Sequence, residues 1–577
     1  MTSQFPVTFP FEFSTVWPTP ELASLQDDLL YAADPQRQAE AADKIAESKD
    51  RYSKEWIVTV YDYLWQKVGE FGDDMMEIVG ADPTNDVPTA TLKIKGTSEY
   101  VSHMMTCQKT LIGVTVETGG LRWAFYVDTF DWEFKDEEWV GTASLIGIWD
   151  ILNFMYVWPN FLLPIQIQAP SHAVFFSPLC TAIEVMVSQC AWRIQLGINE
   201  FLNNALSLNA DIRTWFGTLL QSNGNILDML KTPLYVVRTN PFLDGSPAVV
   251  RTVRMESCGA VIRDISRPYG VDVRVDLWLP GDAQPDQWAN LSRPTYVMTC
   301  KDRSQIEGPT KTVLDSVIRQ AVDVAGSFFG DVSPIVETVP GMNGVFFSPA
   351  LGVNYVPPWA VLIAPDPGQR GSIETCKISF HTPKGWQHIV GGRSPKWLND
   401  LMNAFYAWII DSISILIGIS GIPSNLLDGF LNNMILAFQL VQHYGRRNDV
   451  GPYHPCIEVV HATVSAPYNI ETAFAFINAL YDSRGYVSAQ VMFRDGVVYK
   501  YGKDVFRGGL VSLLYMGSGR LFTDHITNVM FRLTPDNRDV MLTIGDGKAD
   551  ESPLSKHQRN LTGLFEAVNA LTFAPQT

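Results

Sequence analysis

The sequence has few basic residues for its size, and this shortage limits the partners that it can bind. Among 577 residues, 43 are Lys or Arg and 61 are Asp or Glu, which gives a formal net charge of −18. Non-specific binding of nucleic acid needs clustered Lys and Arg, so the negative net charge argues against that function. The acidic balance has two interpretations. It can simply keep the protein soluble, or it can form a channel surface that DNA passes without binding, because like charges repel.

Paired cysteines are also missing. The seven cysteines are scattered along the chain, at Cys107, Cys180, Cys190, Cys258, Cys300, Cys376 and Cys456. None of them forms a C-x-x-C pair, which is the spacing typical of zinc and redox sites. The pattern therefore predicts buried free thiols in a protein made in a reducing compartment, without a bound metal or cofactor.

Sequence motifs of catalysis are absent as well. The chain contains no G-x-S-x-G, no H-E-x-x-H and no Walker loop. His443, His454 and His461 lie close together in sequence with Cys456 among them, but ordinary loop histidines are a better interpretation than a metal site. The acidic stretch that follows Gly545 is best read as a solvated turn. We predict a protein that is not an enzyme and has no catalytic residue.

No hydrophobic run is long enough to be an evident membrane span. The most apolar segment, 404–422, has 13 apolar residues and contains Asp411. A spanning helix needs roughly 20 apolar residues, and a mid-segment Asp is costly in a bilayer. We interpret the segment as a helix buried in protein. The N-terminus lacks the basic and apolar regions of a signal peptide, so we expect none.

What the sequence does have is strand and helix patterning that indicates a multidomain α+β protein. At this length about four domains are expected. We predict an extended segment and polar helix at 1–51, a first β domain at 52–165, a helical and α+β middle domain at 166–331, a Pro-rich loop region at 332–396, an apolar helical hairpin at 397–443, and an α+β region with a second β domain at 444–577. Two β domains thus bracket a helical and loop-rich middle.

Aromatic residues mark the first β domain. The stretch 121–164 reads as a strand, a turn, a strand and a short apolar helix that ends at Trp158-Pro159. The residues that alternate as in strands are Trp123, Phe125, Val127 and then, in shifted phase, Phe130, Trp132 and Phe134; those at helical spacing are Leu145, Ile148, Trp149 and Leu152. Thr118-Gly119-Gly120 predicts the turn of a hairpin over 110–127.

The remaining elements follow from periodicity and turn signals. Strands are predicted at 56–63, 89–96, 232–240, 248–255, 270–279, 486–493, 497–502, 510–516, 526–533 and 539–545, and helices at 181–206, 311–324 and 470–482. Asp495-Gly496 predicts a hairpin between 486–493 and 497–502. In 271–280 the charged Asp272, Arg274 and Asp276 share one face of the strand.

The predicted helical hairpin at 397–443 carries a heptad-like seam. Leu427, Leu431, Met434 and Phe438 repeat at 4-3-4 spacing after a turn at Gly421-Ile422-Pro423-Ser424. Two heptads are too few for a coiled coil. The seam fits packing on the first helix of the hairpin or packing on other copies at a symmetry axis.

A series of motifs, in order along the chain, resembles a phage family. The motifs are WIVTVYDYLWQKVGEFGDD (56–74), GADPTNDVPTATLKIKG (80–96), the section 123–160 that ends in Trp-Pro, VDVRVDLWLPGD (271–282), KDRSQIEGPTKTVLD (301–315), SRGYVSAQVMFRDG (483–496) and MLTIGDGKADESPL (541–554). Together they resemble the tail-hub, or minor tail, proteins of long, non-contractile-tailed phages that infect actinobacteria.

The resemblance implies a fold and a role. Such hubs are similar to the trimeric hub of contractile-tail baseplates, in which each subunit carries two tail-tube-like antiparallel β-barrel domains. Three copies then match the sixfold tube above. The implied partners are two further copies of the chain, a distal tail protein ring, the tape-measure protein, and other minor tail or receptor-binding proteins at the virion tail tip, with DNA passing through unbound and a possible contact with the host membrane.

The residues that we expect to serve assembly are Trp123, Phe125, Trp132, Trp149, Leu427, Leu431, Met434 and Phe438. For each β-domain aromatic the alternative is a place in the core of its own domain. For the apolar hairpin we hypothesise a position at the threefold axis, where it helps to close the channel. The alternative functions are a membrane-active or a cell-wall-degrading tail-tip protein that acts during genome delivery.

Overall fold

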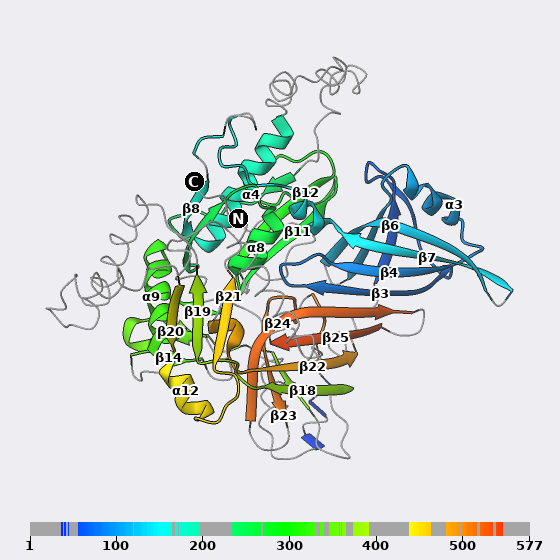
Figure 1. Cartoon of the computed structure of the whole chain (residues 1–577). Helices are drawn as coiled ribbons and strands as arrows, with labels where there is room; N and C mark the ends of the chain where they lie inside the picture. The colour runs from blue at the N-terminus through cyan, green and yellow to red at the C-terminus, as the bar shows by residue number, and fades with distance from the viewer. Residues whose placement is uncertain are drawn as a thin grey trace.

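The computed structural model describes five stretches of the chain. They are 56–196, 234–391, 438–462, 480–545 and a few positions within 36–44, apart from internal gaps at 119–120, 136, 164, 166–167, 171, 267–268, 330–334, 340–344, 357, 359, 365–372, 495–498, 503, 516–519 and 535–537. The architecture is α+β and mostly antiparallel (Figure 1). The fold class predicted from the sequence is thus confirmed at this level.

The N-terminal strands form one half of the main sheet. They are β1 (Ile57–Tyr61), β2 (Lys67–Glu70), β3 (Met75–Pro83), β4 (Thr89–Lys95), β5 (Gly113–Thr118), β6 (Leu121–Lys135) and β7 (Glu138–Gly147), accompanied by α3 (Val101–Met104) and the 3₁₀ helices η1 (Met105–Gln108) and η2 (Ile148–Asn153). The predicted hairpin at 110–127 is confirmed, because β5 and β6 pair from Thr118↔Leu121 onward.

The stretch 121–164 differs from its prediction in two ways. The phase shift after Val127 is a bulge within one continuous strand, since the β6–β7 register shifts between Val127 and Thr129. The prediction of an apolar helix is wrong at Leu145, which lies in strand β7. Of the residues predicted to be helical, only those in the short 3₁₀ helix η2 are helical. Because β7 is paired on both sides, with β4 and with β6, long-range ladders override the helical spacing.

The C-terminal strands form the other half of the sheet. They are β17 (Val361–Ile363), β18 (Thr375–His381), β22 (Tyr486–Arg494), β23 (Leu510–Tyr515), β24 (Arg520–Leu533) and β25 (Arg538–Gly545). The hairpin predicted at Asp495-Gly496 is wrong, because β22 pairs with β18 and β25 and residues 499–502 form no strand. Two of the strands, β17 and β18, come from the region predicted to be Pro-rich loop.

The two halves join into a single sheet. Its order is β18-β22-β25-β24-β3-β4-β7-β6-β5-β1-β2, with β23 paired to β24 and β17 paired to β23. The joint is the β24–β3 ladder, which pairs residues from Asn528↔Pro83 to Leu533↔Ile78 (Figure 1). One hydrophobic core lies under both halves and includes Leu92, Phe125, Phe531 and Leu542. Among the described strands this order does not close into a barrel.

The middle region packs against the sheet and supplies a second core. It contains β8 (Ala173–Pro178), α4 (Leu179–Leu196), β9 (Leu234–Val236), β10 (Ala248–Val253), α8 (Cys258–Ser266), β11 (Val271–Trp278), β12 (Thr295–Asp302), β13 (Ile306–Glu307), α9 (Val313–Phe329), β14 (Glu337–Thr338), β15 (Phe346–Phe347), η4 (Pro349–Leu351) and β16 (Asn354–Tyr355). The helix predicted at 311–324 is confirmed as α9, and the helix predicted at 181–206 is confirmed as α4 up to Leu196; residues 197–206 lie outside the described residues. All eight residues of β11 are buried, including its charged face.

A small sheet corrects the prediction for the apolar hairpin. It contains β19 (Gln387–Gly391), β20 (Phe438–Gln442) and β21 (Glu458–Ala462), next to α12 (Tyr444–Val450). Phe438 pairs with Gly391, so the helix predicted there is wrong: strand pairing wins over the heptad spacing. The other seam residues, Leu427, Leu431 and Met434, and the segment 404–422 lie outside the described residues. Within the described part of the chain, none of the helices is long and apolar enough to cross a membrane.

The joint between the two halves predicts the effect of a small substitution. A Cβ atom on Gly80 of β3 would lie 2.3 Å from Cζ of Phe531, its ladder partner on β24. We expect Gly80→Ala to lower the free energy of unfolding by about 1–3 kcal/mol in urea titrations, because the ring must move. Gly72→Ala is the matched control, since a Cβ there meets no atom within 4 Å. Equal stability of the two variants would contradict this packing.

Candidate assembly site

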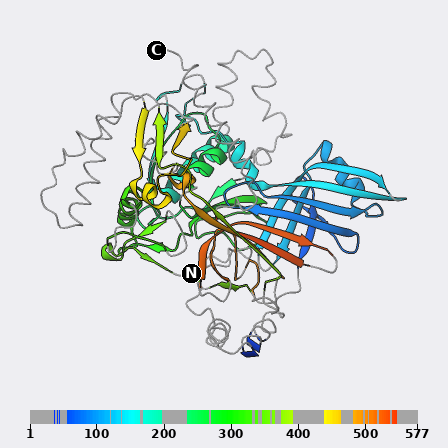
Figure 2. The same ribbon diagram turned by 60° about the horizontal axis from the view of Figure 1, so that its bottom comes forward.

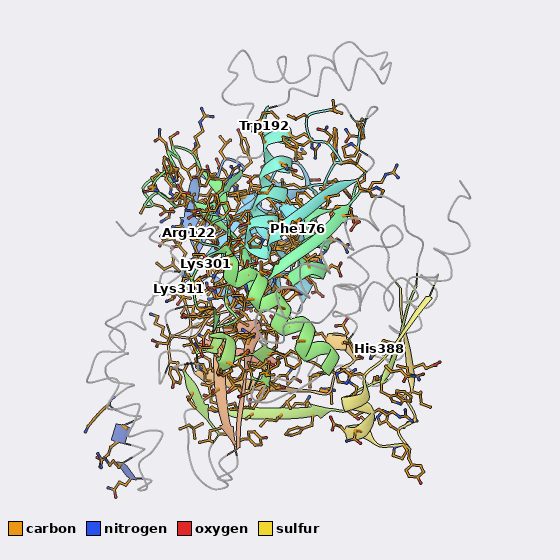
Figure 3. The ribbon with its side chains drawn as sticks, turned by 90° about the vertical axis from the view of Figure 1, so that its left-hand side faces the viewer. Arg122, Phe176, Trp192, Lys301, Lys311 and His388 are labelled. Carbon is orange, nitrogen blue, oxygen red and sulfur yellow. The ribbon has the colours of Figure 1, made fainter. Side chains whose placement is uncertain are left out.

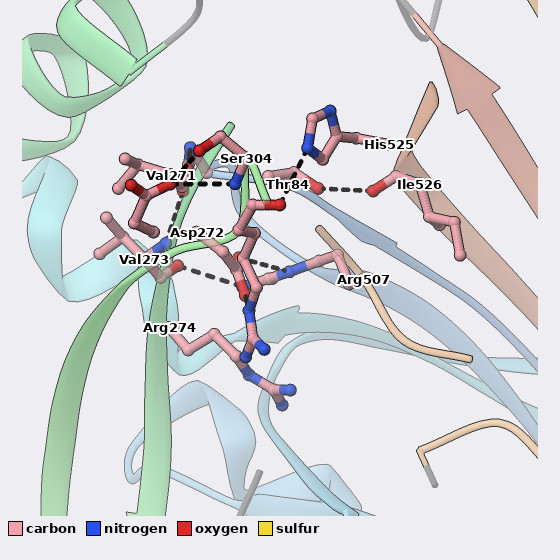
Figure 4. A network of polar contacts seen from close by, with 12 residues as sticks. Thr84, Val271, Asp272, Val273, Arg274, Ser304, Arg507, His525 and Ile526 are labelled. Carbon is pink, nitrogen blue, oxygen red and sulfur yellow. Dashed lines mark hydrogen bonds and ion pairs between the residues drawn. The ribbon is translucent and has the colours of Figure 1, made fainter. Parts of the chain in front are cut away.

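A buried ion network joins three distant parts of the chain. Arg507, in the loop before β23, donates from Nη1 to Asp82 Oδ1 on β3 at 2.6 Å and from Nη2 to Asp272 Oδ1 on β11 at 2.8 Å. All three side chains are at most 2% exposed. Figure 4 shows the Asp272 side of this network, where Arg507 also donates to the carbonyl of Val273. The N-terminal strands, the middle region and the C-terminal strands therefore meet at one guanidinium.

The electrostatics of this network favour the ionised pairs. Burial by itself would lower the pKa of Arg507, but the charges of Asp272 and Asp82 outweigh it and hold that pKa above its usual value. Burial raises the pKa of nearby Asp276, although Arg274 and Arg507 oppose the shift. Burial also lowers the pKa of Arg303 to about 10. Arg507 is thus a permanent cation fixed between two carboxylates, which is a structural arrangement.

Trp123 lies at the same joint. Its indole Nε1 donates to Asp82 Oδ2 at 2.8 Å, so it shares that carboxylate with Arg507. Its ring stacks on Tyr501 and Phe531 of the C-terminal half, with centroids 5.5 and 4.7 Å away. Only 4% of Trp123 is exposed. Within the chain, Trp123 therefore holds the two halves of the sheet together.

Two other aromatics predicted for assembly are also core residues. Phe125, on β6, has a fully buried side chain in the hydrophobic core that both halves of the sheet share. Trp149, in η2, is 1% exposed and donates from Nε1 to the carbonyl of Val273 at 3.1 Å. This bond ties the N-terminal strands to β11. Arg122, labelled in Figure 3, adds a second tie, because it donates to the carbonyl of Leu277 on β11 at 3.2 Å and pairs with Asp282, just after β11, at 2.6 Å.

Trp132 has a different environment from the other three. It lies on the far end of the β6–β7 hairpin, which extends beyond the rest of the sheet (Figures 1 and 2). Its ring stacks on Trp139 with centroids 5.2 Å apart, and Phe134 packs on the other ring at 5.3 Å. Phe134 is 57% and Trp139 46% exposed. Trp132 is thus half-buried at the margin of the main core, whereas its neighbours Phe134 and Trp139 are exposed.

A comparison with known families decides where the chain belongs. The family described as "Siphovirus ReqiPepy6 Gp37-like protein" matches residues 57–546, which is most of the chain. The chain belongs to this Gp37-like family. The membership confirms the resemblance to a siphophage family that the sequence motifs indicated. No curated protein sequence matches the chain.

Solved structures similar to this Gp37-like chain include three tail proteins. They are the prophage MuSo2 43 kDa tail protein from Shewanella oneidensis (11% identity, 86% of this chain and 99% of that chain, TM-score 0.39), the tail protein from Neisseria meningitidis MC58 (10%, 86% and 97%, 0.38) and the prophage tail protein gp18 from Listeria monocytogenes EGD-e (9%, 89% and 100%, 0.35). At this level of similarity no residue or role transfers to this chain.

The ion network of this Gp37-like chain does not follow from the sequence pattern alone. The alternating charges of 271–278 were visible, but their burial and their partners Asp82 and Arg507 were not. A strand whose charged face carries both signs is a signal for a buried network, because opposite charges can pair away from water. Among the described residues, no group of three or more His, Cys, Asp or Glu could hold a metal ion.

Glu184 gives the Gp37-like chain a predicted pH dependence. It lies on α4, is 3% exposed, and accepts bonds from the Thr239 backbone N–H at 2.8 Å and hydroxyl at 2.7 Å. Burial raises its pKa to about 7. The folded state therefore holds a proton that the unfolded chain releases nearer pH 4.5, so stability falls as the pH rises from about 4.5 to 7.

The matching experiment compares wild type with Glu184→Gln in urea titrations at pH 5 and pH 8. From pH 5 to pH 8 the free energy of unfolding of the wild type should fall by up to roughly 3 kcal/mol more than that of the Gln variant. The reason is that a shift of one pKa unit is worth about 1.4 kcal/mol. Groups that titrate elsewhere contribute equally to both proteins. Parallel losses in the two proteins would show that Glu184 is already ionised in the folded state.

Proposed function

We propose that this chain is a structural hub protein of the siphophage tail tip and that it acts as a homotrimer. The observation that carries the proposal is the β24–β3 ladder, which makes two strand groups of one chain into a single body. The Arg507 network and the Trp123 stack support it, since they lock the two groups together. Membership of a siphovirus family supports the phage origin.

The geometry fits a change of symmetry between a trimer and a sixfold tube. In this proposal, the group of N-terminal strands and the group of C-terminal strands in each chain take the place of the two tube-like domains expected from the sequence. Three chains then offer six groups around one axis, matching a tube with six subunits per ring. A rigid joint within each chain keeps the six groups in register with the tube.

In this role the hub joins the tail tube and distal tail ring to tip and receptor-binding proteins. It lines or closes the channel through which the tape-measure protein and DNA pass. The net charge of −18 supports passage of DNA without binding, because like charges repel. The proposal involves no enzyme activity, cofactor or metal. The apolar residues Leu427, Leu431 and Met434 remain candidates for contacts at the threefold axis.

Labelling of intact phage particles tests the location. Antibodies raised against the purified chain and coupled to gold should bind at the tail tip in electron micrographs. A matched serum against the major tube protein should label the tail shaft instead. Label on the capsid, uniform label along the shaft, or absence of the chain from purified particles would each reject the hub function.

A further inference from the structure

Two buried thiols of the middle region lie in contact with each other. Cys190 is on helix α4 and Cys258 is the first residue of helix α8, and their Sγ atoms are 3.6 Å apart. Cys190 is 2% exposed and Cys258 is fully buried. The two helices pack against each other (Figure 1). The fold thus brings together two cysteines that are 68 residues apart in sequence, at a distance that side-chain rotation can reduce to a disulfide bond.

The surroundings make Cys190 the more reactive thiol of the pair. The Cys258 thiol donates to Cys190 Sγ, and this hydrogen bond lowers the pKa of Cys190. Burial opposes the shift, but the positive charge of Arg193 adds to it, so that pKa lies below its usual value. The same hydrogen bond, together with burial, holds the pKa of Cys258 well above its usual value. Because the thiolate is the nucleophile, Cys190 reacts first and Cys258 second.

Two contacts hold Arg193 beside this pair. Its Nη2 donates to the carbonyl of Tyr156 at 3.0 Å, and the same carbonyl accepts a hydrogen bond from Cys190 Sγ at 3.4 Å. Its guanidinium carbon lies 4.0 Å from the centre of the Trp158 ring. Tyr156 is 49% exposed, and Trp158 and Arg193 are half-buried. The two thiols therefore lie one layer below the surface, where side-chain motion admits a small oxidant but not a bulky one.

We propose that Cys190 and Cys258 form an oxidation site, which a hydroperoxide converts into a disulfide between α4 and α8. The Cys190 thiolate attacks one oxygen of hydrogen peroxide, the O–O bond breaks, and Cys190 becomes a sulfenic acid. The other oxygen leaves as hydroxide and takes up the proton that Cys190 released, which gives water. Cys258 then attacks Cys190 Sγ, the S–S bond forms, and the sulfenic oxygen leaves with the Cys258 proton as a second water. Two thiols are oxidised and one peroxide is reduced.

A second thiol pair in the same core has the opposite electrostatic environment. Cys180, also on α4, shares a hydrogen bond with Cys300 on β12. That bond lowers the pKa of Cys180, but burial and the carboxylates of Asp244 and Asp302 outweigh it, so that pKa lies above its usual value. Burial also raises the pKa of Cys300. Since these surroundings suppress the thiolate, we expect this pair to stay reduced while Cys190 and Cys258 are oxidised.

The disulfide would act after the protein has been made. The structure has both cysteines as free thiols, which is the state expected from synthesis in a reducing compartment. Contact with peroxide would then tie α4 to α8 and restrain the unfolding of the middle region, because a cross-link over 68 residues reduces the freedom of the unfolded chain. This inference goes beyond the proposed function and does not depend on it.

The experiment treats the reduced full chain with hydrogen peroxide, denatures it, and blocks the remaining thiols with N-ethylmaleimide. Peptide mapping of the wild type should find Cys190 linked to Cys258, and reduction should remove the link. Cys258→Ser keeps a hydrogen-bond donor but cannot form the disulfide, so Cys190 should accumulate as a sulfenic acid that dimedone traps. Cys300→Ser is the matched control, since it makes the same change in the other pair, and it should form the link as the wild type does.

A change at Arg193 tests the order of the two thiols. Arg193→Gln should slow the formation of the link by about 10-fold at neutral pH and move the pH profile of the rate upward, because less of Cys190 is ionised. An unchanged pH profile would overturn the part assigned to Arg193. A wild type in which both thiols stay free, or a Cys258→Ser variant without a dimedone adduct at Cys190, would overturn the oxidation site. The hub function would stand in each case.

Discussion

Replacing Arg507 with Met should lower the free energy of unfolding by about 3–5 kcal/mol, because buried Asp82 loses its ion pair and buried Asp272 keeps only Arg303, at 4.0 Å. Asp82 and Asp272 are each 1% exposed and bond Arg507 at 2.6 and 2.8 Å. Neither can reach water without separating the segments that the network joins. Urea unfolding monitored by tryptophan fluorescence measures the loss.

Two further variants make the Arg507 prediction specific. Arg532→Met removes an exposed ion pair with Glu77 at 2.7 Å and should cost at most about 1 kcal/mol. Adding Asp82→Asn to Arg507→Met should restore part of the lost stability, since it removes the buried carboxylate that lost its ion pair. Asp272 is kept, because it also faces Arg303 at 4.0 Å. If Arg507→Met costs no more than Arg532→Met, the network does not hold the three segments together.

Truncating Trp123 to Ala should lower the free energy of unfolding by about 3–5 kcal/mol, the range for a large buried aromatic. The indole fills the space between Tyr501 and Phe531 and bonds Asp82, so its loss opens a cavity at the joint and removes a hydrogen bond. The same truncation at Trp288, which is 81% exposed, should change stability by no more than about 0.5 kcal/mol.

The Trp123 variant has a second expected signature. Because its ring joins the two halves of the sheet, its removal should weaken their coupling as well as their stability. Limited proteolysis of Trp123→Ala should release a stable fragment from one half under conditions that leave the wild type intact. Loss of stability without any change in the cleavage pattern would indicate that the two halves are held together by other contacts.

The sequence could predict the parts of the fold that depend on near neighbours. The β5–β6 hairpin follows from the Gly119-Gly120 turn between two alternating segments, and the helix α4 from its apolar face. Both signals lie within about twenty residues. The aromatic content of β6 was also visible, but alternation alone could not separate Trp123, which is buried, from Trp132, which lies on the projecting hairpin.

Contacts between distant segments could not be predicted in this way. The β24–β3 ladder pairs Phe531 with Gly80, and nothing in either local pattern names its partner. The same holds for Arg507, which sits in a loop without regular periodicity yet meets β3 and β11. Asp495-Gly496 is a local turn signal that predicts a hairpin, but both edges of β22 are already paired with distant strands, β18 and β25. These distant pairings therefore exclude the predicted hairpin.

The most direct test of the hub account is a cryo-electron microscopy reconstruction of the tail tip at a resolution that traces strands. The account predicts three copies around the channel below the tube. Each copy should fill two of six positions, one with its N-terminal and one with its C-terminal strands, joined through β3 and β24. Six separate copies in one ring, or three copies whose C-terminal strands lie outside the ring, would contradict it.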